Sequence, residues 1–400
     1  MTESATQTDP IVIVGMARTP MGSFQGDLAK VTAPELGAVA IKAALDRAGI
    51  AGAAVEEVIM GNVLPAGQGQ APARQASVGG GIPMDVGCTT INKMCGSGMK
   101  ATMFAHDLLA AGTNSVMVAG GMESMTNAPY LLTKMRDGQR LGHGEVKDHM
   151  FLDGLEDAFD PGRLMGTFAE DTAQAYQFTR EQQDSYAIES LRRAKAATED
   201  GSFAGEIVAV TIKDRKGETV VDKDEQPLTA DPSKIPNLRP AFAKDGTVTA
   251  ANSSSISDGA AALVLMRQSE AARRGLTPIA RIVGHTSHAQ EPAWFTTAPI
   301  KAIEKLFDKT GWSADDVDLF EVNEAFAVVT MAAMRDLGLP HDKTNIHGGA
   351  CALGHPVGAS GARIIVTLLS ALQKNGLKRG VASLCIGGGE ATAIGLERMN

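Results

Sequence analysis

The chain has 400 residues, 44% hydrophobic and 21% charged, with a formal net charge of −9. This composition predicts a globular protein of about two or three domains with a large core. The acidic charge argues against a nucleic-acid-binding protein, which would carry a basic stripe. No window offers the roughly 18 uninterrupted apolar residues that a membrane span needs, so we expect no membrane partner either.

Four cysteines in so long a chain do not make a disulfide framework, which favours a reducing compartment such as the cytoplasm. None lies in a C-x-x-C pair, so no metal site is expected. Residues 1–10 are polar and acidic, and we interpret them as a disordered lead-in rather than a signal or transit peptide.

The N-terminal third alternates strands and helices. Apolar runs and helical periodicity predict a strand at 11–15, a helix at 34–48 closed by Gly49, a strand at 55–60, a helix at 99–111 and a strand at 115–121. The segment that follows, residues 122–248, is richer in charge and methionine and holds all three tyrosines. We interpret it as an inserted loop domain, with a protruding loop at 131–151 and a helix that begins at a capping box, residues 179–182.

The last third repeats the order of the first. It is predicted to contain strands at 279–283, 317–322 and 381–387 and helices at 299–309 and 361–373. The turns at 95–98 and 358–361 are also alike. Such repetition indicates two duplicated α/β halves. We assign residues 1–121 and 249–275 to the N-terminal half, 122–248 to the inserted domain and 276–400 to the C-terminal half.

Two kinds of helix predict the layering of these halves. The helix at 299–309 has a charged face that includes Lys301 and Glu304, so it lies outside. The helices after the two similar turns are apolar nearly all round and must be covered on both sides. This predicts an α/β fold with five layers, α/β/α/β/α, in which two sheets enclose the central helices.

Cys95 and His355 occupy corresponding positions, each just ahead of a central helix. Because duplication brings the starts of these helices together, we expect a nucleophilic thiol beside its base. The helix start should also favour the thiolate of Cys95. A buried structural cysteine is the commoner situation, and the turn around Cys95 taken alone does not exclude it.

Two further positions complete the candidate site. Cys385 ends a predicted buried strand and runs into Gly387, Gly388 and Gly389, whose free N–H groups could form an oxyanion hole. A plain core cysteine is a serious alternative for Cys385. Asn323 follows the strand at 317–322, where sites form in α/β proteins. These parts predict acyl transfer through a thioester, but they also suit a cysteine hydrolase.

The motifs NKMCGSG at 92–98, NEAF at 323–326, GHP at 354–356 and CIGGG at 385–389 resemble those of the thiolase family, in the same order. The resemblance extends over residues 11–397 and implies the thiolase fold. It implies that Cys95 is acylated by an acyl-CoA while His355 takes its proton, and that Cys385 removes the α-proton of a second acetyl-CoA. It further implies that His355 and a water on Asn323 stabilise one oxyanion, and the N–H groups of Cys95 and Gly387 the other.

The same resemblance implies that coenzyme A lies under the inserted domain, and that no cofactor besides the CoA thioesters is needed. Its expected lining is Leu155, Ala250 and Ser254 along the pantetheine, Phe326 deeper, and Met165 and Phe295 as bulky stops to the acyl chain. For Leu155 and Ala250 the alternative is plain packing. Two positions depart from the family pattern. Leu164 stands where short-chain biosynthetic relatives commonly carry histidine, and residues 224–228 lack an arginine that relatives place near the adenine.

The implied reaction is the reversible condensation of two acetyl-CoA into acetoacetyl-CoA and CoA, by ping-pong kinetics through an acyl-cysteine. Within the family, the alternative is a degradative 3-ketoacyl-CoA thiolase for longer chains. Outside it, a cysteine hydrolase and a non-catalytic acyl-CoA-binding protein are the rivals. Because thiolases form dimers and often tetramers through the protruding loop, the resemblance also implies a homo-oligomer, expected to be a dimer of dimers.

Overall fold

The computed structural model describes residues 9–215 and 217–399. Most of the predicted lead-in, residues 1–8, lies outside the described residues. Asp9 and Pro10 are part of the fold, because the N–H groups of Ser269 and Gln268 donate to them over 3.0 and 2.8 Å. The interpretation of residues 9 and 10 as disordered was therefore wrong.

The N-terminal half contains the predicted alternation, with two short elements that were not predicted, β2 and α2. Its elements are β1 (Ile11–Arg18), β2 (Gly22–Ser23), α1 (Ala33–Ala48), β3 (Glu57–Gly61), α2 (Pro72–Gly79), β4 (Gly87–Ile91), α3 (Ser97–Ala110), β5 (Val116–Ser124) and, after the inserted domain, β10 (Ser257–Arg267). The helix α1 ends as predicted at Gly49, whose φ of 69° is the left-handed conformation that glycine adopts readily.

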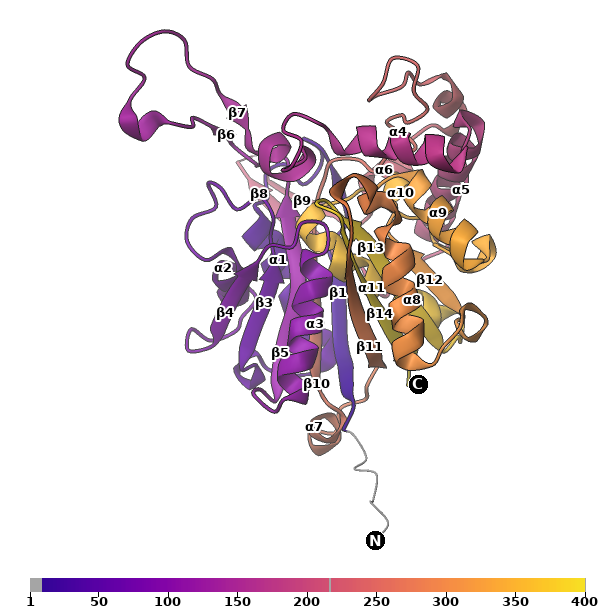
Figure 1. Ribbon diagram of the computed structural model, residues 1–400. Helices are drawn as coiled ribbons and strands as arrows, with labels where there is room; N and C mark the ends of the chain where they lie inside the picture. Colours follow the sequence, from indigo (N-terminus) through magenta and orange to yellow (C-terminus); the bar gives the residue numbers. More distant parts are fainter. Residues whose placement is uncertain (1–8, 216, 400) are drawn as a thin grey trace.

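The C-terminal half repeats the alternation after the short connecting helix α7 (Gln268–Arg273). Its elements are β11 (Ala280–Ala289), α8 (Ala298–Thr310), β12 (Leu319–Val322), α9 (Ala327–Leu337), α10 (Ala350–Leu353), α11 (Val357–Lys374), β13 (Arg379–Ile386) and β14 (Glu390–Arg398). Figure 1 shows the two halves side by side, the first in indigo to magenta and the second in orange to yellow.

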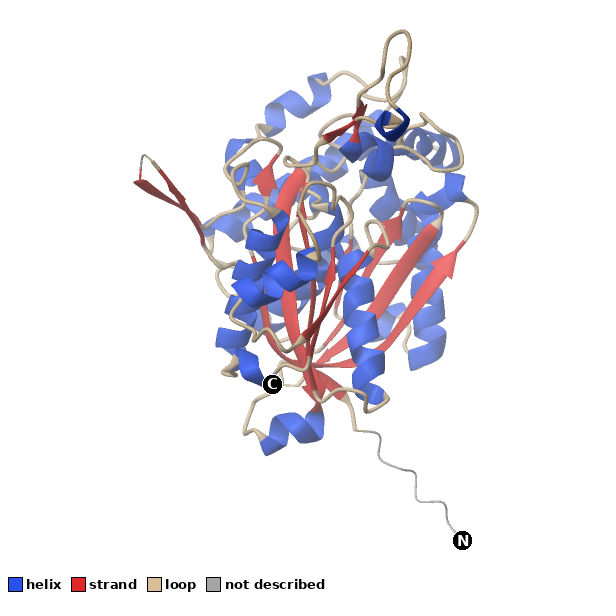
Figure 2. Cartoon of the chain, turned by 90° about the vertical axis from the view of Figure 1, so that its left-hand side faces the viewer, coloured by secondary structure: helices blue, strands red, loops and turns tan. Residues whose placement is uncertain are grey.

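The strands of both halves form one hydrogen-bonded sheet with a narrow seam at its middle. At the seam, β1 and β11 pair through Val12 with Arg281 and Ile13 with Ala280. Outward from it the order is β1, β10, β5, β3, β4 on one side and β11, β14, β13, β12 on the other. The two predicted sheets are thus joined at one edge, and Figure 2 shows their strands fanning out toward the inserted domain.

Apolar side chains place the helices in the predicted layers. Val118 of β5 faces an outer cluster with α1, whereas its neighbour Ala119 faces a central cluster. The central cluster contains residues of α3 and α11 together with the inner faces of the strands of both halves. A third cluster lies between the strands of the second half and the helices α8 and α9. Successive strand residues point to opposite faces, so each half is covered on both sides.

The central helices cross at two glycines. A Cβ on Gly361 would lie 2.4 Å from the backbone nitrogen of Met99, and one on Gly98 would lie 2.7 Å from that of Ala362. Only residues without a side chain allow the two backbones to approach so closely. The starts of α3 and α11 are therefore held against one another, as the duplication predicted.

The inserted domain lies above both halves in Figure 1. It contains β6 (Tyr130–Leu131), β7 (Lys147–Asp148), η3 (Phe151–Leu155), α4 (Met165–Tyr176), α5 (Arg180–Glu199), β8 (Val210–Asp214), β9 (Gly217–Val221) and α6 (Glu225–Thr229). The predicted capping box at α5 is confirmed: Thr179 accepts from the N–H of Gln182, whose side chain accepts from the N–H of Thr179. The exact limits of the three assigned domains stay predictions.

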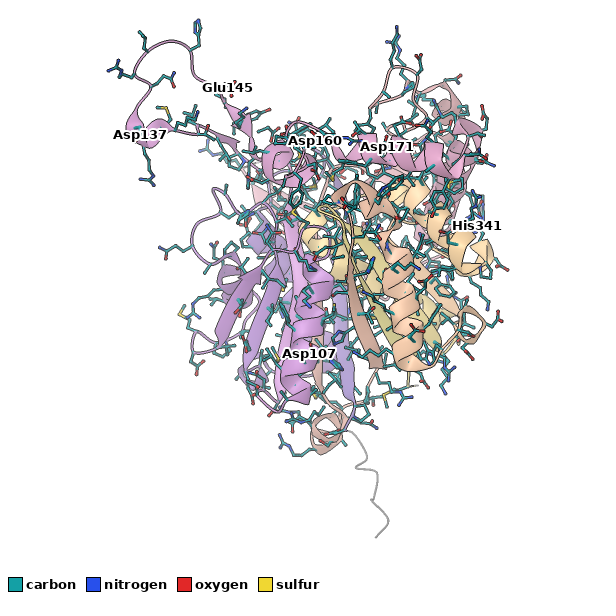
Figure 3. All side chains as sticks on the ribbon, in the orientation of Figure 1. Asp107, Asp137, Glu145, Asp160, Asp171 and His341 are labelled. Atoms are coloured by element: carbon teal, nitrogen blue, oxygen red, sulfur yellow. The ribbon has the colours of Figure 1, made fainter. Side chains whose placement is uncertain are left out.

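The loop between β6 and β7 extends away from the body, and Figure 3 shows Asp137 on its outer part and Glu145 near its return to β7. Among the described residues, no helix combines the length and apolar character that crossing a bilayer requires.

Candidate active site

Cys95 lies two residues before α3, in a turn fixed by its neighbours. Asn92 Oδ1 accepts from the N–H of Met94 over 2.8 Å, and the N–H of Lys93 donates to Ser97 Oγ over 2.8 Å. The Ser97 hydroxyl in turn donates to the carbonyl of Met94. Met94 has a φ of 46°, a conformation that a residue with a side chain adopts only where its surroundings enforce it. The turn therefore presents Cys95 in one defined position.

The Cys95 sulfur meets the turn between β13 and β14 of the other half. The N–H of Gly387 donates to this sulfur, and the Cys385 side chain is close enough to interact electrostatically with it. A Cβ on Gly96 would lie 2.4 Å from Ile386 Cδ1, so the two turns are in contact. Cys95 from the first half and Cys385 from the second half therefore lie close together.

Both thiols are neutral in the substrate-free protein. Burial raises the pKa of Cys95 to about 11, although the N–H groups of Gly387 and Cys95 act in the opposite direction. Burial, and then the neighbouring Cys95, raise the pKa of Cys385 well above its ordinary value. The expectation that the helix start gives a thiolate at Cys95 was wrong, because desolvation outweighs the backbone donors. A base must therefore take the proton during the reaction.

His355 is the residue predicted to act as that base. It is 6% exposed, and burial, followed by the charge of Arg363, lowers its pKa to about 3, so the imidazole is neutral. Its Nδ1 lies 2.5 Å from Ser360 Oγ, which also donates to the carbonyl of Pro356 over 2.9 Å. Both bonds form together only when Nδ1 carries the proton and donates to Ser360. The Nε2 atom, buried and without a partner among the described residues, then keeps a free lone pair.

Asn323 offers a buried donor at the end of β12. Its Oδ1 accepts from Arg363 Nη2 over 3.2 Å, and its own N–H donates to the carbonyl of Ser383. Within the described residues Nδ2 is buried and has no hydrogen-bond partner. A buried, unpaired amide can hold a water or a substrate oxygen.

The predicted lining residues fall into two groups. Leu155 borders the same apolar cluster as Cys95, and the Met165 sulfur lies 3.4 Å from where a Cβ on Gly387 would be. Phe295 and Phe326 belong to the apolar cluster that contains Cys385. Leu155 and Met165 are therefore close to the turns that carry the two cysteines, whereas Phe295 and Phe326 share a large apolar cluster with Cys385.

Ser254 and Ala250 lie in the segment that connects the inserted domain to β10. The N–H of Ser254 donates to the carbonyl of Ala325, next to Phe326. Ala250 lines a surface pocket of about 240 Å³, which Lys234 also lines. No contact between Ala250 and the catalytic turns is seen in the part of the chain that the structure describes, so its predicted role depends on the length of the ligand.

The comparisons with known proteins agree with this arrangement. Residues 11–269 match the family description "Thiolase, N-terminal domain", and residues 276–398 match "Thiolase, C-terminal domain". The chain belongs to the thiolase family.

Curated relatives and a solved structure extend the match over the full length. A thiolase of Arabidopsis thaliana named "Acetyl-CoA acetyltransferase 2" is 52% identical over 99% of this chain and 98% of its own. The "Acetyl-CoA acetyltransferase" of Allochromatium vinosum is 47% identical over 97% of this chain and 99% of its own. The crystal structure of the Bacillus anthracis acetyl-CoA acetyltransferase matches with a TM-score of 0.95 and 41% identity, over 98% and 99% of the two chains. The predicted thiolase fold is thereby confirmed.

The sequence analysis did not identify Glu123, which connects the two halves of this thiolase next to the site. It is fully buried at the end of β5, and its carboxylate accepts from the N–H groups of Val63, Leu64 and Gly358. Gly358 is the second residue of α11, so this carboxylate holds the helix that follows His355 against the other half. Burial raises the Glu123 pKa to about 7. An acidic residue ending an apolar strand was the only signal available in the sequence.

Glu324, in the thiolase motif NEAF, is an anchor for the inserted domain. It accepts from Tyr186 Oη over 2.8 Å and from Ser190 Oγ over 2.7 Å, both on α5. It also accepts from Asn345 Nδ2 and from the N–H of Cys351. These bonds hold the rest of the NEAF motif, including Asn323 and Phe326, in a fixed position relative to the inserted domain, which is expected to cover coenzyme A.

The two departures from the thiolase pattern have structural accounts. Leu164 is the residue immediately before α4, and it is half-buried beside Met165. Asp224 is buried and binds Arg18 through two hydrogen bonds of 2.7 and 2.9 Å. Glu225 accepts from the N–H groups of Ser23 and Asp27, both over 2.9 Å. This acidic pair therefore holds the chain together and is not available to a nucleotide.

Proposed function

We propose that this thiolase is an acetyl-CoA acetyltransferase, which joins two acetyl-CoA into acetoacetyl-CoA and CoA and catalyses the reverse reaction. The observation that supports it most is the proximity of two neutral thiols, one from each half: the half-buried Cys95, which accepts from the N–H of Gly387, and the buried Cys385. A hydrolase needs one cysteine, whereas condensation needs one to carry the acyl group and another to move an α-proton. The names of the relatives support the acetyl group as the unit transferred.

In the first half-reaction His355 Nε2 takes the proton of Cys95 as its sulfur attacks the carbonyl carbon of acetyl-CoA. The C–S bond to coenzyme A then breaks, and the departing thiolate takes the proton back from His355. The imidazolium exists only while it holds a proton in transit, which suits a site where burial opposes a permanent charge. A water held by Asn323 Nδ2 would stabilise the thioester oxyanion, together with His355.

In the second half-reaction the Cys385 thiol gives its proton to His355 Nε2, which later passes it to Cys95, and the Cys385 thiolate takes an α-proton from a second acetyl-CoA. The resulting carbanion attacks the acetyl group on Cys95, forming the new C–C bond. The N–H groups of Cys95 and Gly387 stabilise the oxyanion of that tetrahedral intermediate. Its collapse breaks the C–S bond to Cys95, which takes up a proton as acetoacetyl-CoA leaves. The reaction needs no group besides the CoA thioesters and these residues.

The test separates acylation from condensation. Acetyl-CoA labelled in the acetyl group is mixed with the wild type and with Cys385→Ala, Cys95→Ser and Cys88→Ser. We expect Cys385→Ala to be labelled on Cys95 while its condensation falls about 10³-fold, because it lacks the α-proton base. Cys95→Ser should lose both activities. The control Cys88→Ser, altered on the half-buried strand β4, should match the wild type.

Full condensation by Cys385→Ala would contradict the proposal, and so would a wild type that hydrolyses acetyl-CoA faster than it condenses it. A wild type that binds acetyl-CoA without labelling Cys95 would instead indicate a non-catalytic binding protein. Chain length is tested with acetoacetyl-CoA and 3-ketooctanoyl-CoA in the thiolysis direction. We expect at least a tenfold preference for acetoacetyl-CoA, since Met165 and Phe295 limit the acyl pocket. Comparable rates would favour a degradative 3-ketoacyl-CoA thiolase.

For coenzyme A, we propose a path from Cys95 past Leu155 and Ser254 to the pocket at Ala250. Lys234 lines that pocket and has an exposed side chain, so it is our candidate for the nucleotide phosphates. Lys234→Ala should raise KM for acetyl-CoA and leave kcat unchanged, because the residue does not touch the reacting atoms. An unchanged KM would place the nucleotide elsewhere.

We further propose a cytoplasmic homotetramer. The protruding loop carries exposed apolar side chains, including Leu132, Leu141 and Val146, which a neighbouring subunit would cover. All four cysteines are free thiols, as expected in a reducing compartment. Light scattering after replacing these three loop residues with serine should show a smaller assembly. An unchanged mass would exclude the loop as the contact.

A further inference from the structure

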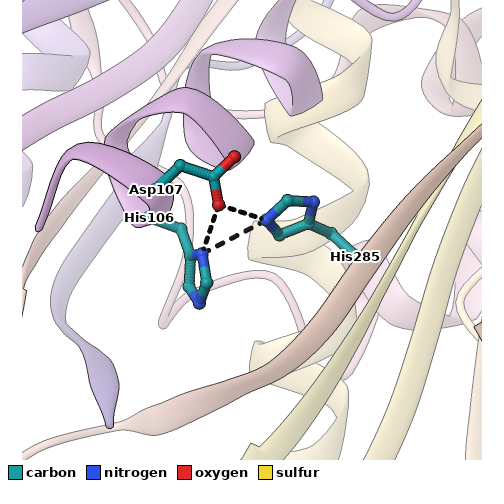
Figure 4. Close-up of side chains that lie close together, drawn as sticks. All are labelled: His106, Asp107 and His285. Atoms are coloured by element: carbon teal, nitrogen blue, oxygen red, sulfur yellow. Dashed lines mark hydrogen bonds and ion pairs between the residues drawn. The ribbon is translucent and has the colours of Figure 1, made fainter. Parts of the chain in front are cut away.

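Three side chains converge far from the catalytic cysteines. His106 and Asp107 lie toward the end of α3, and His285 lies on β11 (Figure 4). Figure 3 shows Asp107 at the end of the molecule opposite the inserted domain. His106 Nδ1 and His285 Nε2 lie 3.0 and 2.9 Å from the same carboxylate oxygen of Asp107, and 3.2 Å from one another.

Hydrogen bonding alone leaves one of these three contacts unfavourable. The ionised carboxylate can only accept, so each imidazole nitrogen must donate to it. The two N–H groups would then face one another over 3.2 Å. If instead one nitrogen is unprotonated, its lone pair faces the carboxylate oxygen. All three contacts become favourable when the three atoms direct their lone pairs at one cation.

The spacing fits such a cation. With metal–ligand distances of about 2.1 Å, neighbouring ligand atoms lie about 3.0 Å apart in octahedral and about 3.4 Å apart in tetrahedral coordination. The observed separations of 2.9 to 3.2 Å are close to the octahedral value. The two imidazole rings stand nearly perpendicular, at 85° with centroids 4.8 Å apart, so their nitrogens approach the common point without stacking.

We propose that His106, Asp107 and His285 bind one divalent transition-metal ion of the Zn²⁺ class, which ties α3 of the first half to β11 of the second. Two imidazoles and one carboxylate are typical ligands of Zn²⁺, Co²⁺ and Ni²⁺. Mg²⁺ and Ca²⁺ prefer several oxygen ligands, and this site offers one carboxylate with the Lys309 ammonium nearby on the carbonyl of His285.

The role assigned to this ion is structural. Asp107 has a side chain that is 56% exposed, so water can complete the coordination, while His285 is 10% exposed and fixes the inner side. Along the chain, β5, the inserted domain and β10 separate the two elements that the ion would join. It takes no part in acyl transfer, so the proposal stands or falls independently of the proposed function. The absence of a cysteine pair explains why the sequence did not point to it.

The test measures metal binding by the full-length protein after treatment with a chelator and dialysis. Co²⁺ is used as a spectroscopic probe and Zn²⁺ for calorimetry and thermal unfolding. We expect one ion per chain, without the intense near-ultraviolet band of a cobalt–thiolate bond. At a hundredfold excess over Kd, Zn²⁺ should raise Tm by about 3 °C.

His106→Asn, His285→Asn and the exposed Asp107→Asn should each weaken binding at least thirtyfold and abolish the rise in Tm. The matched control is His288→Asn, which changes another histidine of β11 that bonds to Gln290. It should bind like the wild type. Binding that persists within threefold in Asp107→Asn and His285→Asn would overturn the proposal. A cobalt–thiolate band would do so too, as would the lack of saturable binding below millimolar concentrations.

Discussion

The hydroxyl of Ser360 should control which nitrogen of His355 acts as the base. In the structure it accepts from Nδ1–H and donates to the carbonyl of Pro356, which leaves Nε2 unprotonated. Ser360→Ala removes this acceptor in a fully buried place. The Nδ1–H group then has no partner, and the imidazole can avoid that state by moving its proton to Nε2. A protonated Nε2 cannot take the proton of Cys95.

The size of the effect follows from the cost of a buried donor without an acceptor, about 1–3 kcal/mol. The imidazolium that forms when Nε2 takes the proton of Cys95 must keep a proton on Nδ1, so in Ser360→Ala this state bears that cost. A factor of ten in rate corresponds to about 1.4 kcal/mol, so kcat/KM for acetylation of Cys95 should fall about 5- to 150-fold. The fall should lie in kcat, because Ser360 is a fully buried residue of α11 and does not touch coenzyme A.

The assay is quenched-flow labelling of Cys95 by acetyl-CoA. Ser370→Ala is the matched control, since Ser370 is a buried hydroxyl of the same helix that lies ten residues further along. It should acetylate like the wild type. If Ser360→Ala is acetylated within twofold of Ser370→Ala, the hydroxyl does not select the tautomer, and the argument that makes Nε2 the base fails.

Two further predictions concern a buried histidine and a buried amide. Burial lowers the pKa of His347 from 6.5 to about 4 in the folded protein. As the pH falls from 6.5 toward 4, the unfolded chain takes up a proton that the folded protein does not, so the histidine destabilises the fold. The free energy of unfolding of His347→Gln, measured with urea, should therefore rise by about 2 kcal/mol relative to that of the wild type between pH 7 and pH 5. A difference between the two proteins that does not change with pH would contradict this. Asn323→Ala removes the unpaired Nδ2 and should slow acetylation of Cys95 about 10- to 100-fold, whereas an unchanged rate would mean that no oxygen is held there.

Duplication made most of the fold predictable, because apolar periodicity repeats in both halves. It failed where burial depends on distant partners. Arg18 extends β1 beyond its apolar run, yet it is fully buried because it pairs with Glu206 and Asp224 from the inserted domain. The strand β14 was missed because Glu390–Arg398 contains few large apolar residues. Its burial comes from its place between β11 and β13.

The catalytic candidates could be recognised because each stands at the end of an apolar strand or the start of an apolar helix. The residues that position them are harder to recognise, because their partners are distant in the sequence. Glu123 accepts from the N–H of Gly358, a contact that exists only where the two halves pack together. Nothing in the sequence distinguishes Ser360 from other helix serines, and its role follows from its contact with His355. Local sequence predicts which groups react, but contacts between halves decide their protonation and position.

The crossing of α3 and α11 should therefore control the rate even though no catalytic side chain takes part in it. A Cβ on Gly361 would lie 2.4 Å from the Met99 nitrogen, which is backbone in the first turn of α3 and cannot yield without moving Cys95. Gly361→Ala should cost about 1–3 kcal/mol of stability and slow acetylation about 100-fold through misplacement of the nucleophile. Gly87→Ala, where an added Cβ meets nothing within 4 Å, is the control. Equal acetylation rates in both variants would show that this helix contact does not set the distance between thiol and base.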